Sequence, residues 1–270
     1  MSEPSLSQIV EIADRLFPFE SAETWDNCGV QIGDPDRTIR AVAFSLDATP
    51  QTVKFAADHS CDLLITHHPV LLEPLHRIVP DTLSGRTLLC AARMGVDILS
   101  LHTNLDAAAG GLNDELAAML ALEDVITPFP ARCARLGRLR SSMTVRDLAD
   151  KVLADLGIDS VRVISESDLE VRRVFCATGS GMGYLKEAVS HQADVLLTGD
   201  VRYHAAREAA EMGMPVIDAG HYALEKIAVP LLTRSFHREF HVMGLEVTCI
   251  GCDLEEEPFT HIQAARRNFG

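Results

Sequence analysis

The sequence predicts an α/β protein built from two similar lobes, and two observations lead to this prediction. Short runs of apolar and β-branched residues alternate with helix-like stretches along most of the 270 residues, as in sheets that are covered on both faces. In addition, parts of the first half of the chain resemble parts of the second half, which indicates an internal repeat.

The predicted elements begin with an N-terminal amphipathic helix that carries Ile9, Ile12, Ala13 and Leu16 on one face. Strands are predicted where the apolar runs are continuous, at residues 41–46, 62–66, 96–101, 174–178, 194–198 and 216–219. Helices are predicted beside them, at residues 50–59, 85–94, 182–191 and 201–212.

Two pairs of segments carry the repeat. Residues 59–66 (HSCDLLIT) align with residues 191–198 (HQADVLLT) without a gap, and residues 95–102 align with residues 213–221 after one insertion. The alternative is chance, because any two strand–helix units look somewhat alike. The repeat predicts one lobe over residues 1–127 and another over residues 128–270, since the prolines of TPFP at 127–130 interrupt the pattern.

Composition narrows the possible partners and the compartment. The net charge is −15, from 24 Lys and Arg against 39 Asp and Glu, which argues against nucleic acid or an anionic membrane as a partner. Apolar runs stay short of the roughly 18 residues that a membrane helix needs, and the N-terminus lacks the pattern of a signal peptide. We therefore expect a cytoplasmic protein.

The cysteines fit the same expectation. There are seven, an odd number spread along the chain, which favours a reducing compartment over a disulfide framework. Cys249 and Cys252 form a CxxC in an apolar, strand-like run. A redox or metal role is the alternative there, but packed, reduced thiols are the expectation.

Three clusters of polar residues follow predicted strands, at the edge where open α/β sheets place their ligands. His67 and His68 come directly after the strand at 62–66 and, as neighbours, can reach two different ions. Asp106 follows the strand at 96–101; its alternative role is an ordinary helix N-cap. His221 and Glu225 are four residues apart, on one helix face, where a surface pair is the alternative.

The combination of three imidazoles and two carboxylates predicts a pair of divalent ions in the cleft between the two lobes. Mixed nitrogen and oxygen ligands suit Zn, Mn, Fe, Co or Ni better than Ca or Mg. A carboxylate bridges the two ions of dinuclear hydrolases, and Asp106 is the candidate here because it is central in the sequence. His102 remains as a partner of a ligand or as a substrate contact.

Other residues are candidates for contacts around the metal site. Asp26 and Asn27, next to the only tryptophan, Trp25, either surround the site or form a buried anchoring turn. Asp200 and His204 face the metals or form an ordinary helix pair. The glycine-rich segment at 179–183 (GSGMG) either binds phosphate through backbone N–H groups or makes a tight turn without a ligand.

Seven motifs in order resemble the NIF-three-like dinuclear-metal family, whose bacterial members are often labelled type-2 GTP cyclohydrolase I homologues. The motifs are WDNCGVQIG (25–33), SLDAT (45–49), ITHHP (65–69), HTNLD (102–106), ATGSG (177–181), LTGD (197–200) and DAGHY (218–222). The resemblance implies metal ligation by the same five residues: His67, His68, Asp106, His221 and Glu225.

The resemblance also implies an assembly and an activity. It implies a toroidal homohexamer, a trimer of dimers, whose sites face an inner cavity. This chain corresponds to the short form, without the domain that some relatives insert between the halves. The expected function is metal-dependent hydrolysis of a nucleotide, with GTP as the first substrate to consider. The alternative is a non-catalytic metal-binding assembly with a regulatory or metal-handling role.

Overall fold

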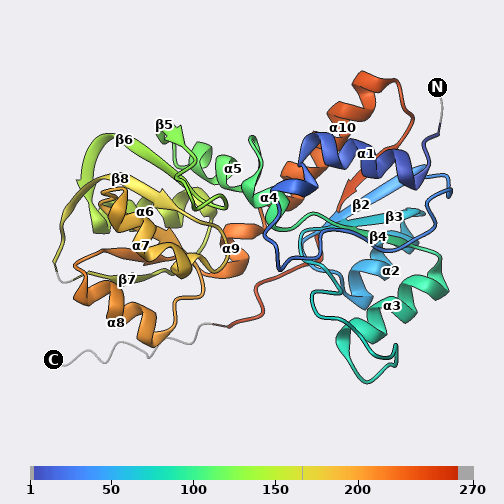
Figure 1. Cartoon of the computed structure of the whole chain (residues 1–270), viewed down its shortest axis with the longest axis horizontal. Helices are drawn as coiled ribbons and strands as arrows, with labels where there is room; N and C mark the ends of the chain where they lie inside the picture. Colours follow the sequence, from blue (N-terminus) through green and yellow to red (C-terminus); the bar gives the residue numbers. More distant parts are fainter. Residues whose placement is uncertain (1–2, 166, 261–270) are drawn as a thin grey trace, which may run out of the picture.

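The computed structural model describes residues 3–165 and 167–260 and contains two β-sheets in separate halves of the molecule (Figure 1). The first sheet has the order β1-β4-β3-β2-β11, with β1 (Gly29–Ile32), β2 (Ala41–Ser45), β3 (Leu63–Thr66), β4 (Asp97–Ser100) and β11 (Thr248–Gly251). The second has the order β5-β6-β8-β9-β10-β7, with β5 (Glu123–Ile126), β6 (Arg135–Thr144), β7 (Arg162–Ile164), β8 (Glu170–Cys176), β9 (Val195–Thr198) and β10 (Val216–Asp218). The predicted mixed α/β class is confirmed.

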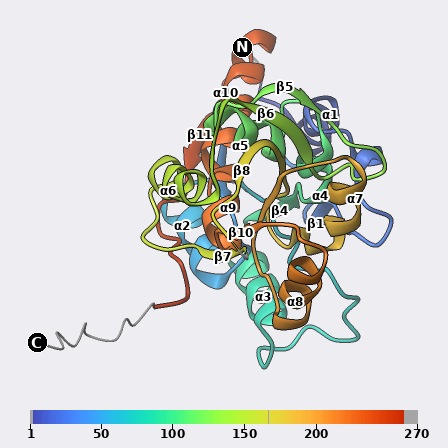
Figure 2. The ribbon, with the colours of Figure 1, turned by 90° about the vertical axis from the view of Figure 1, so that its left-hand side faces the viewer.

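Helices connect the strands and cover both sheets. They are α1 (Leu6–Leu16), η1 (Phe19–Ser21), α2 (Pro50–Asp58), α3 (Leu83–Met94), α4 (Thr103–Ala107), α5 (Leu112–Met119), α6 (Val145–Leu156), η2 (Gly181–Tyr184), α7 (Leu185–Ser190), α8 (Tyr203–Glu211), α9 (His221–Glu225) and α10 (Ala228–Met243). In two perpendicular views α1 and α10 lie above the sheets, and α3 and α8 lie below them (Figures 1 and 2).

The strand topology repeats between the two sheets. In the first, β2, β3 and β4 are parallel neighbours and β1 pairs antiparallel with β4. In the second, β8, β9 and β10 are parallel neighbours and β7 pairs antiparallel with β10. Because β3 and β9 occupy equivalent central positions, the alignment of residues 59–66 with 191–198 reflects a structural repeat. Each copy ends in a short helix, α4 or α9, that follows its last parallel strand.

The division of the chain differs from the predicted boundary between residues 127 and 128. β5 ends at Ile126 but pairs antiparallel with β6 of the second sheet. Near the C-terminus, β11 returns to the first sheet and pairs parallel with β2. This pairing gives the outer backbone groups of β2 hydrogen-bond partners, which a strand edge otherwise lacks. The C-terminal segment therefore belongs partly to the first half of the molecule.

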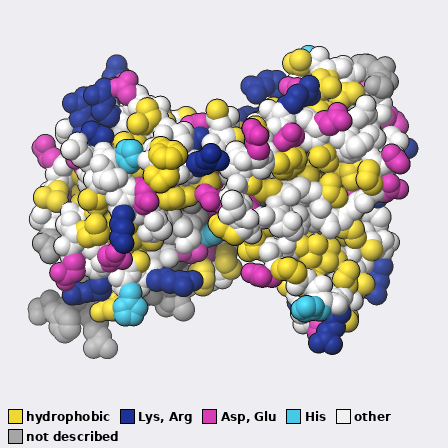
Figure 3. Space-filling view, viewed as in Figure 1, with side chains coloured by type: hydrophobic (Ala, Val, Ile, Leu, Met, Phe, Trp, Pro, Cys, Tyr) yellow, Lys and Arg dark blue, Asp and Glu magenta, His cyan; other side chains and the backbone are white. Residues whose placement is uncertain are grey.

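One hydrophobic cluster extends through both halves, although the surface narrows between them (Figure 3). It contains Ile9 of α1, Leu63 of β3, Phe236 of α10 and Val195 of β9, all fully buried. Two smaller clusters lie on the opposite faces of the sheets, under α2 and α3 and under α7 and α8. The shared cluster fixes the segments between the sheets, where the chemistry-bearing residues lie.

Within the described ranges, no helix has the length and apolar character needed to cross a membrane. The CxxC at the end of β11 consists of free thiols: Cys249, within the strand, is half-buried, and Cys252, directly after it, is buried. Burial raises the pKa of Cys249 to about 12, so this sulfur remains a thiol near neutral pH.

Candidate metal centre

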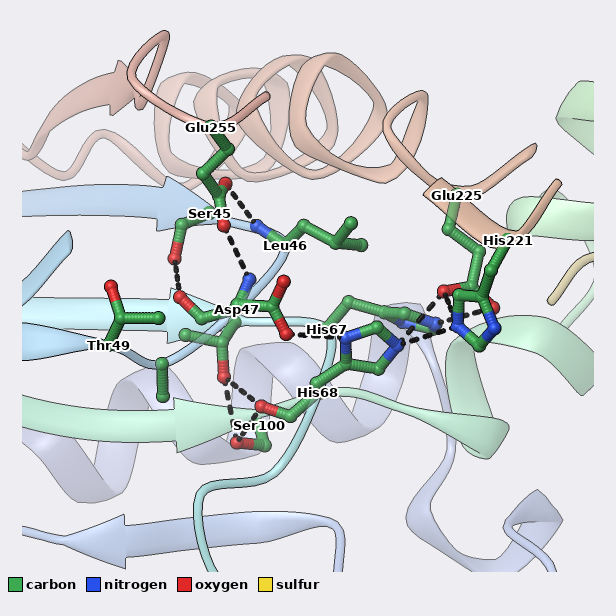
Figure 4. A network of polar contacts seen from close by, with 12 residues as sticks. Ser45, Leu46, Asp47, Thr49, His67, His68, Ser100, His221, Glu225 and Glu255 are labelled. Atoms are coloured by element: carbon green, nitrogen blue, oxygen red, sulfur yellow. Dashed lines mark hydrogen bonds and ion pairs between the residues drawn. The ribbon is translucent and has the colours of Figure 1, made fainter. Parts of the chain in front are cut away.

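The candidate metal centre lies where three parallel strands end, between the two sheets (Figures 1 and 4). His67 and His68 follow β3 directly. His102 precedes α4, which contains Asp106, and α9 begins at His221 and ends at Glu225. Each copy of the repeat thus delivers a histidine with a carboxylate four residues later, after its last parallel strand.

Two of the alternatives to metal ligation that the sequence left open are wrong. Asp106 is not an N-cap, because the cap position of α4 belongs to His102 and Asp106 lies inside the helix. The pair of His221 and Glu225 is not an ordinary surface pair, because Glu225 is only 3% exposed. Both carboxylates are buried beside imidazole rings, where a charge without a partner is costly.

Four histidine rings are oriented in the same way, by a hydrogen bond from Nδ1 to an oxygen: His67, His68, His102 and His221. The Nδ1 of His67 lies 2.9 Å from the carbonyl oxygen of Leu101, which can only accept a hydrogen bond. Carboxylate oxygens accept from the other three at 2.8 Å each: Asp47 from His68, Asp26 from His102 and Asp200 from His221. A neutral ring held in this way carries its lone pair on Nε2.

The Nε2 atoms of His67, His68 and His221 point toward the buried carboxylate of Glu225 (Figure 4). The Nε2 atoms of His68 and His221 are 3.3 Å apart, and they lie 2.9 and 2.8 Å from Oε2 of Glu225. The Nε2 of His67 lies 3.8 Å from Oε1 of Glu225 and 3.9 Å from Oδ1 of Asp106. Glu225 therefore directs one oxygen toward His67 and the other toward His68 and His221.

Two groups of residues have the geometry to hold a metal ion. His67, His68 and His102 form one group, and His68, His221 and Glu225 form the other; within each, the possible ligand atoms lie within 4.8 Å of one another. His102 thus joins the proposed ligands more closely than the sequence indicated. Asp106 lies beside His67 and accepts a hydrogen bond from Thr178 of the second half, at 3.2 Å.

The carboxylates change the pKa values of the imidazoles. Burial opposes protonation of His68, but hydrogen bonds to Asp47 and Glu225 raise its pKa to about 10. The hydrogen bond to Glu225, against a smaller effect of burial, raises the pKa of His221 to about 9. Burial also opposes protonation of His67, but the charges of Asp106 and Glu225 outweigh the effect of burial and raise the pKa of this ring. Without a metal, protons hold these rings and carboxylates together.

The donor set fits a divalent metal. The Nε2 of His67 is buried and has no hydrogen-bond partner among residues 3–165 and 167–260. An unpaired nitrogen of this kind is rare in a protein interior, and a metal ion would satisfy it. The neighbouring imidazole nitrogens and carboxylate oxygens are the ligand types that zinc and related transition metals take.

The glycine-rich segment has a packing role. A side chain at Gly179 would place its Cβ 2.1 Å from Oε1 of Glu225, and the backbone there has a φ of +60°. The N–H of Gly181 already donates to Oγ1 of Thr198 at 2.7 Å. The segment therefore makes room for Glu225, which favours the tight-turn interpretation over the phosphate cradle.

The remaining candidates divide between the site and the surface. Asp26 and Asp200 reach the site through His102 and His221. Asn27 instead donates to the carbonyl of Leu71 at 2.6 Å, which anchors the loop after His68. His204 is exposed on α8 and packs edge-to-face on Tyr203, so the structure does not bring it to the centre.

Two features of the site were missed or misjudged from the sequence. Asp47, which holds His68, is not among the residues predicted from the sequence, although it follows the strand at 41–46 and belongs to the SLDAT motif at 45–49. Trp25 is 60% exposed and meets His102 edge-on, with ring centroids 5.9 Å apart. The buried-anchor interpretation is therefore wrong for the indole, which lies at the solvent side of the site.

The fold and this centre define a mixed α/β protein with residue groups suited to metal ions. A family model described as Duf34/NIF3 (NGG1p interacting factor 3) matches residues 4–258. The chain belongs to this family.

Named relatives and a solved structure agree with the assignment. The chain is 33% identical over 233 residues to the "GTP cyclohydrolase 1 type 2 homolog" of Streptomyces coelicolor, covering 82% of each protein. It is 28% identical over 261 residues to the homologue of that name from Clostridium acetobutylicum, covering 94% of this chain and 97% of the relative. The crystal structure of a Bacillus cereus protein related to NIF3 has a TM-score of 0.91 at 21% identity, covering 97% of this chain and 100% of the other, and shows a shared fold.

Proposed function

We propose that the chain binds two divalent transition-metal ions and uses them to hydrolyse a nucleotide. The observation that supports this proposal is the convergence of three Nε2 atoms, those of His67, His68 and His221, on two buried carboxylates, with the Nδ1 of each ring held by an oxygen acceptor. The proposed ligands are His67, His68, Asp106, His221 and Glu225, the set expected from the sequence. His102 is added as a further candidate ligand.

The contacts suggest how these ligands divide between the ions. His68 and His221 share Oε2 of Glu225, whereas His67 faces Oε1 of the same carboxylate. Glu225, which contacts all three of these imidazoles, is therefore a better candidate for the bridging ligand than Asp106, whose Oδ1 lies 3.9 Å from the Nε2 of His67. The two neighbouring histidines serve different ions in this assignment, because each faces a different oxygen of Glu225.

The surrounding residues complete the chemistry. Two ions held by these ligands would supply Lewis-acid activation of a water molecule and of the bond that it attacks. Asp26 holds the proton on Nδ1 of His102, because hydrogen bonds from His102 and Thr103 outweigh its burial and keep its pKa well below the usual range. The side chains of His68 and His221 are 23% and 35% exposed, so a substrate would approach from their side.

The nucleotide is supported by the relatives' names and by one feature of the site. Relatives are named for GTP cyclohydrolase 1 type 2, and GTP is the first substrate to test. The exposed indole of Trp25 beside His102 offers a flat surface on which a base can stack. We therefore propose a purine nucleotide, with its base near Trp25 and the attacked bond over the paired ions.

The test is hydrolysis by metal-loaded protein. Wild-type protein is incubated with GTP and assayed for formate, and with a phosphodiester as a second substrate. Glu225→Gln should abolish turnover, whereas His204→Ala, which alters an exposed histidine outside the centre, should leave it unchanged. Loaded wild-type protein that hydrolyses neither compound contradicts the enzymatic part of the proposal.

A non-catalytic role is the second candidate, and the burial of the centre favours it. His67, Asp106 and Glu225 are each less than 10% exposed, so much of the ligand set is closed to a substrate. A regulatory or metal-handling protein would bind the ions with the same ligands but without turnover. Metal binding that is reduced in Glu225→Gln, together with the absence of hydrolysis in the wild type, would favour this candidate.

A further inference from the structure

The C-terminal segment returns to the metal centre after β11, and Glu255 lies at the point of return (Figure 4). Its carboxylate accepts hydrogen bonds from the backbone N–H groups of Leu46 and Asp47, both at 2.7 Å. These two residues form the turn that follows β2. Two charge-assisted hydrogen bonds from adjacent amides fix this turn more firmly than neutral bonds would.

The same turn orients one of the proposed ligands. Oδ1 of Asp47 accepts from Nδ1 of His68 at 2.8 Å, and the Nε2 of His68 faces Glu225. The backbone carbonyl of Asp47 also accepts from Ser45 at 3.0 Å and from Thr52 at 2.9 Å. Glu255 thus acts on His68 through Asp47.

Glu255 also contacts the other half of the centre. Its backbone carbonyl accepts a hydrogen bond from the hydroxyl of Tyr222 at 2.5 Å. Tyr222 follows His221 in α9, the helix that ends at Glu225. One residue of the C-terminal segment therefore joins the turn that holds His68 to the helix that carries His221 and Glu225.

We propose that Glu255 is a positioning residue of the metal centre, which sets the affinity for the ion shared by His68, His221 and Glu225. The inference rests on the proposed metal binding and extends it to a residue outside the ligand set. Residues that orient a metal ligand typically contribute roughly 10–100-fold to metal affinity. The ion on the side of His67 should depend on Glu255 much less, because the Nδ1 of His67 is held by Leu101 instead.

The experiment compares Glu255→Gln with Glu256→Gln. A glutamine can accept from only one of the two amides and turns its own NH₂ group toward the other. Glu256 is the neighbouring, exposed residue, so its variant makes the same charge change without touching the turn. Co²⁺ is titrated into metal-free protein against a competing chelator, and the two binding steps are followed by absorption.

We expect Glu255→Gln to weaken one of the two steps by roughly 10-fold and to leave the other within about twofold, with Glu256→Gln like the wild type. Asp47→Asn should weaken the same step, and the double variant should lose no more than Asp47→Asn alone, since Glu255 acts through Asp47. A general effect on folding would weaken both steps and would add to Asp47→Asn.

The outcomes separate this inference from the proposed function. Wild-type protein that binds no Co²⁺ contradicts the metal centre itself. Wild-type binding with equal affinities for Glu255→Gln and Glu256→Gln overturns only the role of Glu255. If Glu255→Gln does not fold, Tyr222→Phe, which removes the hydroxyl from the same link, must weaken the same single step, and unchanged binding then overturns the inference.

Discussion

Replacing Asp114 by asparagine should destabilise the fold through a buried arginine that supports the centre. Arg135 of β6 is only 2% exposed and pairs with both carboxylate oxygens of Asp114. Its Nη2 also donates to the carbonyls of Ala107 and Ala108, at 3.2 and 2.8 Å, directly after Asp106. The guanidinium therefore ties the second sheet to the segment that carries a proposed ligand.

The size of the effect follows from the burial of the pair. Leaving one member of a buried ion pair without its partner costs about 3–5 kcal/mol. Because the side chain of Asp114 is 30% exposed, water reaches the carboxylate and we expect the lower end, about 3 kcal/mol. For a chain of this size this loss lowers the melting temperature by roughly 6–12 °C.

The assay is thermal unfolding of metal-free protein, with Asp124→Asn as the matched control. Asp124 pairs with Arg138 across β5 and β6, but both side chains are more than half exposed. Exposed pairs contribute less than about 1 kcal/mol, so the control should melt close to the wild type. Equal melting temperatures for Asp114→Asn and Asp124→Asn would refute the reasoning about burial.

Three further predictions concern the centre and the assembly. Metal affinity should rise steeply from pH 7 to 9, because His68 and His221, with pKa values of about 10 and about 9, lose protons when a metal binds. Calorimetry in buffers of different ionisation enthalpy should detect about two released protons, and binding without proton release would contradict the assignment. Asp200→Asn should weaken metal binding by roughly 10-fold or more in a chelator competition, because it holds His221, and unchanged affinity would remove that role. Light scattering should give a homohexamer, whereas a monomer that persists over a tenfold dilution range would count against the ring.

The parallel core of the fold was predictable because its strands are buried on both faces. Residues 63–66 and 195–198 are continuous apolar runs that end in threonine, and all eight residues are buried. β6 was missed for the opposite reason: it is long, partly exposed and rich in arginine, so no apolar pattern marks it. The strand that pairs with β11 was also not predictable, because the pairing of β11 with β2 joins segments about two hundred residues apart in the sequence.

The ligands of the candidate site that follow strands were predictable, but the residues that position these ligands from distant parts of the sequence were not. His67 and His68 follow a recognisable strand, and the spacing of His221 and Glu225 is visible in the sequence. Glu255 lies in an acidic run after β11, and nothing in the neighbouring sequence indicates that its carboxylate accepts hydrogen bonds from the turn at Leu46 and Asp47. Long-range contacts of this kind have no periodicity or motif to reveal them.

The metal content of the purified chain tests the central claim most directly. Elemental analysis of wild-type protein, after incubation with zinc or manganese at neutral pH and removal of free metal, should find about two ions per chain. Glu225→Gln should hold fewer, because this carboxylate contacts both proposed positions, and His204→Ala should match the wild type. Wild-type protein that retains no metal under these conditions would contradict the account.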